Sequence, residues 1–180
     1  MDDTKWARLS KAGVFSCPWY GLSHDRYRQP DGDVGDYFYI DIPGSTMIIP
    51  LLEDGRMVLT RQFRYLVRRF SLEFPAGGIK PGYDPLFNAQ QELREEAGYV
   101  ADDWSRIGEF APYNGVSNEL CQVYVARALT AVPTEPDPSE EIEVVALAVE
   151  AVEAEIKSGA IWDGMTIASF SRFQHWSAKL

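Results

Sequence analysis

The hydrophobic pattern of the chain alternates between short strand-like segments and longer helix-like ones. Segments rich in β-branched and aromatic residues, bounded by turn residues, predict strands. These segments are Tyr20–Arg28, Asp36–Ile42, Met47–Leu52, Arg56–Phe63, Arg69–Phe74, Trp104–Phe110, Cys121–Ala128 and Glu143–Val149. The turn residues Pro30–Gly32 predict a hairpin between the first two strands.

The clearest predicted helix is Pro85–Ala97. Asp84 can cap it, proline stands at its first position, and Gly98 follows its end. Two more helices are predicted at Glu150–Lys157 and Asp163–Trp176. Strands mixed with helices predict an α/β fold.

The rest of the chain is predicted to be connecting segments. Pro75–Gly78 should interrupt the strands, and Thr130–Ser139, with its prolines, should form a loop. We divide the chain into an N-terminal strand section, residues 1–45, and a main domain, residues 46–180.

Composition narrows the function classes. The 180 residues carry a formal net charge of −10, which argues against bulk binding of nucleic acid. Two cysteines, Cys17 and Cys121, cannot build a disulfide framework. The start of the chain lacks the pattern of a signal peptide, and no apolar run is long enough for a membrane span. We therefore expect a cytoplasmic protein without a membrane partner.

Candidate chemistry gathers on the first predicted helix. Glu92, Glu95 and Glu96 stand at i, i+3 and i+4, so that they share one side of the helix. The neighbouring apolar stripe consists of Leu86, Ala89, Leu93 and Ala97. Like charges at this spacing repel, unless a cation such as Mg²⁺ or Mn²⁺ binds between them. The alternative is a solvated charged helix face.

The segment Gly77–Tyr99 resembles the Nudix box. Gly77 takes the first position of that pattern, and the last six specified positions are matched by Glu92, Leu93, Glu95, Glu96, Gly98 and Tyr99. Tyr83 stands where the pattern has its first glutamate, and Gln91 where it has an arginine. Because Gln91 cannot neutralise charge, we expect a weaker or differently poised metal cluster.

Further segments are similar to the branch of ADP-ribose and ADP-sugar diphosphatases. They are Trp19–Gly32, Arg61–Arg64, Glu73–Gly77, Gly115–Asn118 and Glu140–Val144. The resemblance implies a Nudix α/β/α sandwich with a mixed sheet, preceded by the small antiparallel strand section. It also implies metal-dependent hydrolysis of ADP-ribose or an ADP-sugar to AMP and a sugar phosphate. Alternatives are another nucleotide sugar, such as GDP-mannose, or a catalytically impaired nucleotide-binding module.

The resemblance also implies roles for single residues. The metal ligands would be the carbonyl of Ala76 and the carboxylates of Glu92, Glu95, Glu96 and Glu140, with a supporting carboxylate as the alternative role of Glu95. Catalysis would fall to Glu140, with Glu141 as the alternative, and to Glu95 and Glu96. Substrate would be bound by Trp19, Tyr37 (or Tyr39), Arg64, Gly77, Gly115 and Ser117. The cofactor would be Mg²⁺ or Mn²⁺, and the N-terminal strands would form a homodimer.

Overall fold

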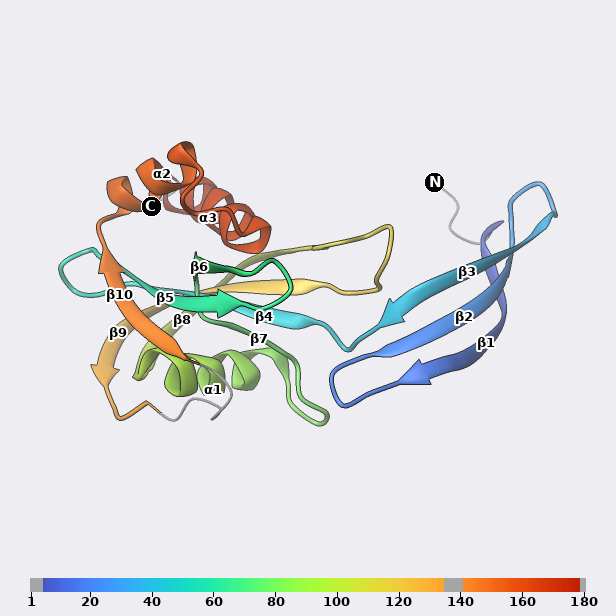
Figure 1. Cartoon of the computed structure of the whole chain (residues 1–180), viewed down its shortest axis with the longest axis horizontal. Helices are drawn as coiled ribbons and strands as arrows, with labels where there is room; N and C mark the ends of the chain where they lie inside the picture. The colour runs from blue at the N-terminus through green and yellow to red at the C-terminus, as the bar shows by residue number, and fades with distance from the viewer. Residues whose placement is uncertain (1–4, 135–140, 179–180) are drawn as a thin grey trace.

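The computed structural model describes residues 5–134 and 141–178. The N-terminal part is a separate antiparallel sheet in the order β1 (Ala7–Ser16), β2 (Gly21–Arg28) and β3 (Val34–Asp41) (Figure 1). The predicted hairpin of the second and third strands is confirmed. No strand was predicted at β1, because nearly all its side chains are exposed and it lacks a buried face that would impose alternation.

The main domain contains two sheets in the described part of the chain. One has the order β7 (Ala76–Gly78), β4 (Ser45–Pro50), β9 (Cys121–Ala131) and β8 (Tyr99–Phe110). The other has the order β10 (Ile142–Leu147), β5 (Met57–Arg64) and β6 (Arg69–Glu73). Strands β4 and β9 are parallel and the other pairs are antiparallel, which confirms the predicted mixed sheet.

Helices cover both sides of these sheets. α1 (Pro85–Ala97) lies on one side, and α2 (Val149–Ser158) and α3 (Gly164–Ser177) lie on the other (Figure 1). The main domain has two hydrophobic cores, and strand β4 contributes side chains to both. Met47 and Ile49 pack in the core with α2 and α3, and Ile48 packs in the core against α1. Burial on both faces explains why this strand is apolar without alternation. No helix in the described ranges is long and apolar enough to cross a membrane.

The predicted helices begin and end close to where their caps indicated. The carboxylate of Asp84 accepts a hydrogen bond from the Phe87 N–H at 3.0 Å, and Gly98 ends α1 in the left-handed conformation at φ 70°. Asp163 caps α3 in the same way, accepting from the Thr166 N–H at 2.7 Å. Local capping chemistry therefore fixes both ends of α1 and the start of α3.

Some predicted boundaries were wrong. β7 forms within Pro75–Gly78, where an interruption was predicted, because this short segment pairs with the edge of β4. β8 begins at Tyr99 instead of Trp104, since pairing with β9 supports a stretch that is largely exposed. β10 ends at Leu147, and Val149 already belongs to α2.

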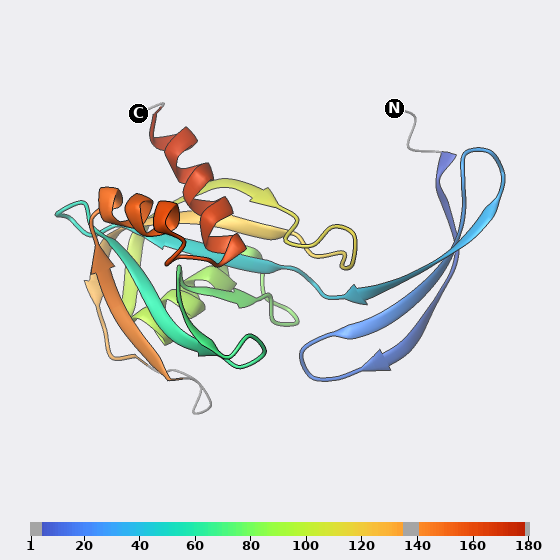
Figure 2. The ribbon, with the colours of Figure 1, turned by 45° about the horizontal axis from the view of Figure 1, so that its top comes forward.

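The N-terminal sheet extends away from the main domain (Figure 2). It touches the loop that precedes β9 through hydrogen bonds at the end of β3. The N–H of Ile40 donates to the carbonyl of Val116 at 2.8 Å, and the Asn118 amide donates to Asp41 at 2.7 Å. This loop is therefore the link that orients the sheet.

Candidate active site

The glycine loop brings the backbone directly against the acidic side of α1. Strand β7 runs beside β4 and places Gly77 over Glu92. A Cβ atom on Gly77 would overlap the carboxylate of Glu92. Only glycine lets the backbone of the loop approach the Glu92 carboxylate this closely, so the contact between the loop and α1 depends on glycine at residue 77.

The acidic face of α1 is not a solvated surface. Glu92 and Glu96 are each only 7% exposed, and Glu95 is half-buried. The Ala76 N–H donates a hydrogen bond to Oε2 of Glu96 at 3.1 Å. Burying carboxylates this close together is costly unless positive charge or hydrogen-bond donors compensate for it. The apolar stripe beside the glutamates is packed as predicted, and two of the three glutamates are buried with it.

One positive charge already lies within this group. The Lys80 ammonium lies 3.1 Å from Oε2 of Glu95 and 4.0 Å from Oε1 of Glu92. Partial burial lowers the pKa of Lys80, but the hydrogen bond to Glu95 and the charges of both glutamates outweigh it and raise the pKa above 10.5. Lys80 was not predicted as a site residue; its signal in the sequence was a basic residue in the loop before the acidic helix.

The donor set suits a hard divalent cation. Carboxylate oxygens and a backbone carbonyl are ligands that Mg²⁺ and Mn²⁺ prefer, and the ammonium between Glu92 and Glu95 shows that a cation is accommodated there. In the arrangement described, however, no three acidic, histidine or cysteine side chains among residues 5–134 and 141–178 form a metal-holding group.

A cavity of about 610 Å³ lies over these carboxylates. One wall is the turn between β1 and β2, which carries Trp19, and the other is the glycine loop with α1. Trp19 is 81% exposed, so its ring faces are open for stacking. Six of the predicted site residues line this one cavity: Trp19, Ala76, Gly77, Glu92, Glu95 and Glu96.

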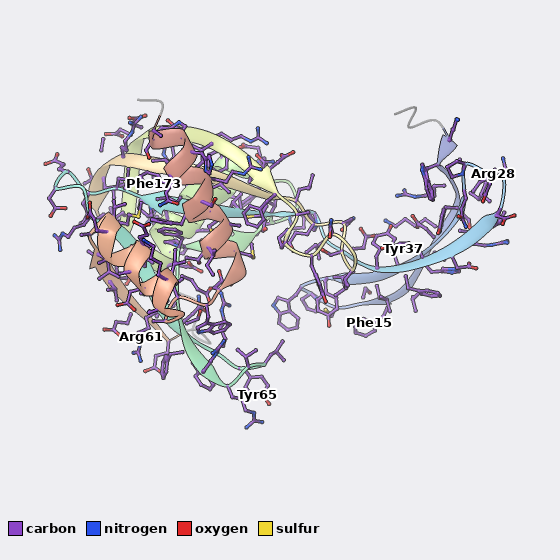
Figure 3. The ribbon with its side chains drawn as sticks, turned by 90° about the horizontal axis from the view of Figure 1, so that it is seen from above. Phe15, Arg28, Tyr37, Arg61, Tyr65 and Phe173 are labelled. Carbon is purple, nitrogen blue, oxygen red and sulfur yellow. The ribbon has the colours of Figure 1, made fainter. Side chains whose placement is uncertain are left out.

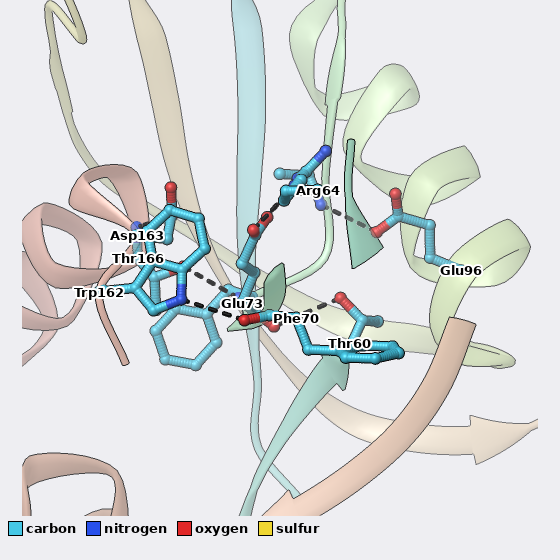
Figure 4. Close-up of polar contacts among 10 residues, drawn as sticks. Thr60, Arg64, Phe70, Glu73, Glu96, Trp162, Asp163 and Thr166 are labelled. Atoms are coloured by element: carbon cyan, nitrogen blue, oxygen red, sulfur yellow. Dashed lines mark hydrogen bonds and ion pairs between the residues drawn. The ribbon is translucent and has the colours of Figure 1, made fainter. Parts of the chain in front are cut away.

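Arg64 lies beside the carboxylates, outside the lining of this cavity. Its guanidinium makes a two-pronged ion pair with the buried Glu73, with Nε 2.8 Å from Oε1, at the end of β5 (Figure 4). The hydrogen bond to Glu73 is the main cause that raises the pKa of Arg64, and the charge of Glu96 adds to it. Glu73 was given no role from sequence, because its partner lies on the neighbouring strand.

The remaining predicted residues form a separate group. The Tyr37 hydroxyl donates to the carbonyl of Gly115 at 3.0 Å, and the Ser117 hydroxyl donates to the carbonyl of Tyr113 at 3.4 Å. The first of these hydrogen bonds joins the N-terminal sheet to the loop before β9, and the second lies within that loop. Glu140 lies outside the described residues. Its alternative, Glu141, is exposed next to β10.

The two departures from the box lie on or beside α1. The ring of Tyr83 meets that of Phe87 edge to face, with centroids 4.7 Å apart. Gln91 is half-buried and precedes Glu92 on the helix. Tyr83 therefore packs as an aromatic residue, where the pattern would have placed a charge.

Comparisons of the sequence with family models and with known proteins agree on one type of domain. The family model described as the NUDIX domain matches residues 42–170. The chain is 26% identical over 168 residues to the ADP-ribose pyrophosphatase of Bacillus subtilis, covering 92% of this chain and 91% of that protein. It is also 26% identical over 163 residues to the methanol dehydrogenase activator of Bacillus methanolicus, covering 89% and 88%. The two relatives are equally similar but differently named, so they do not decide the substrate.

A solved structure shows the same fold. The crystal structure of an ADP compounds hydrolase aligns with a TM-score of 0.81 at 18% identity, covering 95% of this chain and 93% of that one. At this identity the match concerns the fold alone. It extends over nearly the whole chain.

Proposed function

Because this chain belongs to the NUDIX domain family, we propose that it hydrolyses the diphosphate bond of a nucleoside diphosphate sugar. ADP-ribose or an ADP-sugar is the proposed substrate, and AMP and a sugar phosphate are the products. The observation that carries this proposal is the cavity in which the carboxylates of α1 face an open tryptophan. Relatives named ADP-ribose pyrophosphatase in Bacillus subtilis and Mycobacterium tuberculosis support the choice of substrate.

The carboxylate end of the cavity would receive the diphosphate. Glu92, Glu95 and Glu96, with the carbonyl of Ala76 and with Glu140, would hold Mg²⁺ or Mn²⁺. Such an ion neutralises phosphate charge and lowers the pKa of water. Gly77 lets the backbone approach the carboxylates, and the Ala76 N–H orients Glu96. We assign to Glu140 the placing and deprotonation of the attacking water.

The other end of the cavity would receive the nucleoside. The Trp19 ring is open on the turn between β1 and β2 and offers an apolar face to a base. Tyr37, Gly115 and Ser117 would shape the sugar side from the linked loop and sheet. The guanidinium of Arg64, which is paired with Glu73, would also lie near Glu96 and the diphosphate.

A homodimer is part of the proposal. The N-terminal sheet exposes many large apolar side chains: Trp6, Leu9, Val14, Phe15, Tyr20, Val34, Tyr37 and Phe38. Phe15 lies toward the main domain and Arg28 at the far end of the sheet (Figure 3). Apolar exposure of this extent is typical of a surface that another chain covers, and we propose a second copy as that chain.

Product analysis with a panel of nucleotide sugars tests this function. Purified protein with Mg²⁺ or Mn²⁺ should release AMP from ADP-ribose faster than it releases GMP from GDP-mannose. Faster release of GMP would move the substrate to another nucleotide sugar. Failure to cleave any member of the panel would contradict hydrolysis.

A second candidate function is nucleotide binding without turnover. The observation that favours it is Lys80, whose ammonium lies between two of the carboxylates. A binding module would give a heat of binding with ADP-ribose and no AMP, whereas an enzyme gives AMP.

A further inference from the structure

Lys80 is held at the carboxylates by the architecture of its loop. Its N–H donates to Oδ1 of Asn88 at 3.1 Å, and the Asn88 amide donates to the hydroxyl of Thr46 at 3.0 Å. Asn88 and Thr46 are fully buried. A buried and satisfied amide therefore fixes the backbone from which the Lys80 side chain reaches Glu95 and Glu92.

Two of the three carboxylates lie at this ammonium. It contacts Glu95 at 3.1 Å and approaches Glu92 to 4.0 Å, while the Ala76 N–H holds Glu96. Among the described residues these side chains do not converge on a common metal position. The Lys80 side chain is 46% exposed, which leaves it room to move into the cavity that it also lines.

We propose that Lys80 is the resident counter-ion of the carboxylate site, which a divalent cation must displace and whose charge therefore weakens metal binding. The inference rests on the proposed function, because that function places the metal at Glu92, Glu95 and Glu96. An ammonium and a divalent cation compete for the same oxygens, and repulsion between them opposes joint occupancy.

Binding of Mn²⁺ without nucleotide tests the proposal by titration calorimetry. The Lys80→Met variant keeps the apolar stem of the side chain and removes its charge. It should bind Mn²⁺ on the order of tenfold more tightly than the wild type. In the wild type the partly exposed Lys80 ammonium is only partly screened by water and repels the cation. The Lys80→Arg variant keeps the charge and should bind Mn²⁺ about as the wild type does.

The matched control is Lys157→Met on α2. Lys157 also pairs with a glutamate, Glu153 at 2.8 Å, but on a different helix from the acidic site. Its loss should leave Mn²⁺ affinity unchanged. Equal affinity of wild type and Lys80→Met would overturn the proposal and leave the hydrolase function standing. Absence of Mn²⁺ binding to both would overturn the proposal together with the metal site, and AMP release then decides whether the hydrolase function survives.

A measurement on the wild type covers the case in which Lys80→Met does not fold. Displacement of the ammonium breaks its ion pair with Glu95, so acetic anhydride should acetylate Lys80 faster when Mn²⁺ is present. Mass spectrometry compares this rate with that of Lys157, which should not change. Unchanged or slower acetylation of Lys80 would contradict displacement.

Discussion

At the scale of single residues, the contact between Gly77 and Glu92 joins the glycine loop to the acidic helix. The backbone lies so close to the carboxylate that any side chain on Gly77 would overlap it. The next glycine, Gly78, has open space around the same position. The two neighbours therefore make a matched pair for mutation.

We predict that Gly77→Ala lowers kcat/KM for ADP-ribose about 100-fold, because a shift of about 1 Å in a catalytic group has an effect of that order. Gly78→Ala should retain activity within about threefold, since nothing lies within 4 Å of its added Cβ. Steady-state kinetics on both variants measures the difference. Equal activities would show that the close approach is irrelevant to the reaction.

Three of the residues that the sequence identified have a spacing that lies within one segment. Glu92, Glu95 and Glu96 share a helix face, so their proximity follows from helix geometry alone. Lys80 and Glu73 were missed as contributors, because their partners are brought to them by loop closure and strand pairing. Local geometry therefore predicted the helix carboxylates, whereas spacing along the chain did not predict contacts between separate elements.

At the scale of elements, the end of β3 connects three parts of the chain. Asp41 accepts hydrogen bonds from the Ser23 hydroxyl at 2.8 Å and the Asn118 amide at 2.7 Å, and it pairs with Lys11. The hydrogen bond from Lys11 is the main cause that holds the pKa of Asp41 below 3.8, and that from Ser23 adds to it. One carboxylate thus joins β1 and β2 to the loop before β9.

We predict that Asp41→Asn lowers the melting temperature at pH 7. A carboxyl whose pKa is lowered by folding stabilises the protein above its unfolded value, near 3.8, and loses that contribution as the pH falls through its lowered folded value. The difference in melting temperature between wild type and variant should therefore be largest at pH 7 and should shrink below about pH 4. A gap independent of pH in thermal melts would contradict this role.

Elements were predictable to different degrees for physical reasons. α1 was predicted at both ends, because Asp84, Pro85 and Gly98 act locally. Strands β1 and β7 were missed, because one is exposed along nearly its whole length and the other exists by pairing with β4. A strand that forms because it pairs with a neighbouring strand need not show a pattern of hydrophobic and polar residues in its own sequence.

At the scale of the whole molecule, the fold of one chain does not explain why the N-terminal sheet exposes so many apolar side chains. Its strands expose large side chains, of which Phe15 is 56% exposed. The turn between β1 and β2 carries Trp19, which lines the cavity over the carboxylates, so covering this sheet by a second copy would also affect that cavity.

We predict that Phe15→Glu converts a dimer of about 40 kDa into a monomer of about 20 kDa, because charge is disfavoured in an apolar interface; these masses are roughly two copies and one copy of the 20.3 kDa chain. The control Val100→Glu introduces the same charge at a 40% exposed residue of β8 and should remain dimeric. Light scattering after gel filtration gives both masses. A monomeric wild type would contradict the dimer.

Hydrolysis at the carboxylate site is tested most directly by AMP release from ADP-ribose in the presence of Mg²⁺ by wild type and Glu96→Gln. Glu96 is buried, accepts from the Ala76 N–H and lines the cavity, whereas the control Glu53→Gln changes an exposed glutamate in the turn before β5. We predict AMP and ribose phosphate from wild type and from Glu53→Gln, and a loss of roughly 100-fold or more in the rate of Glu96→Gln, since removing one charge-stabilising group in an active site has an effect of that order. Undiminished AMP release by Glu96→Gln, or none by the wild type, would contradict hydrolysis at this carboxylate site.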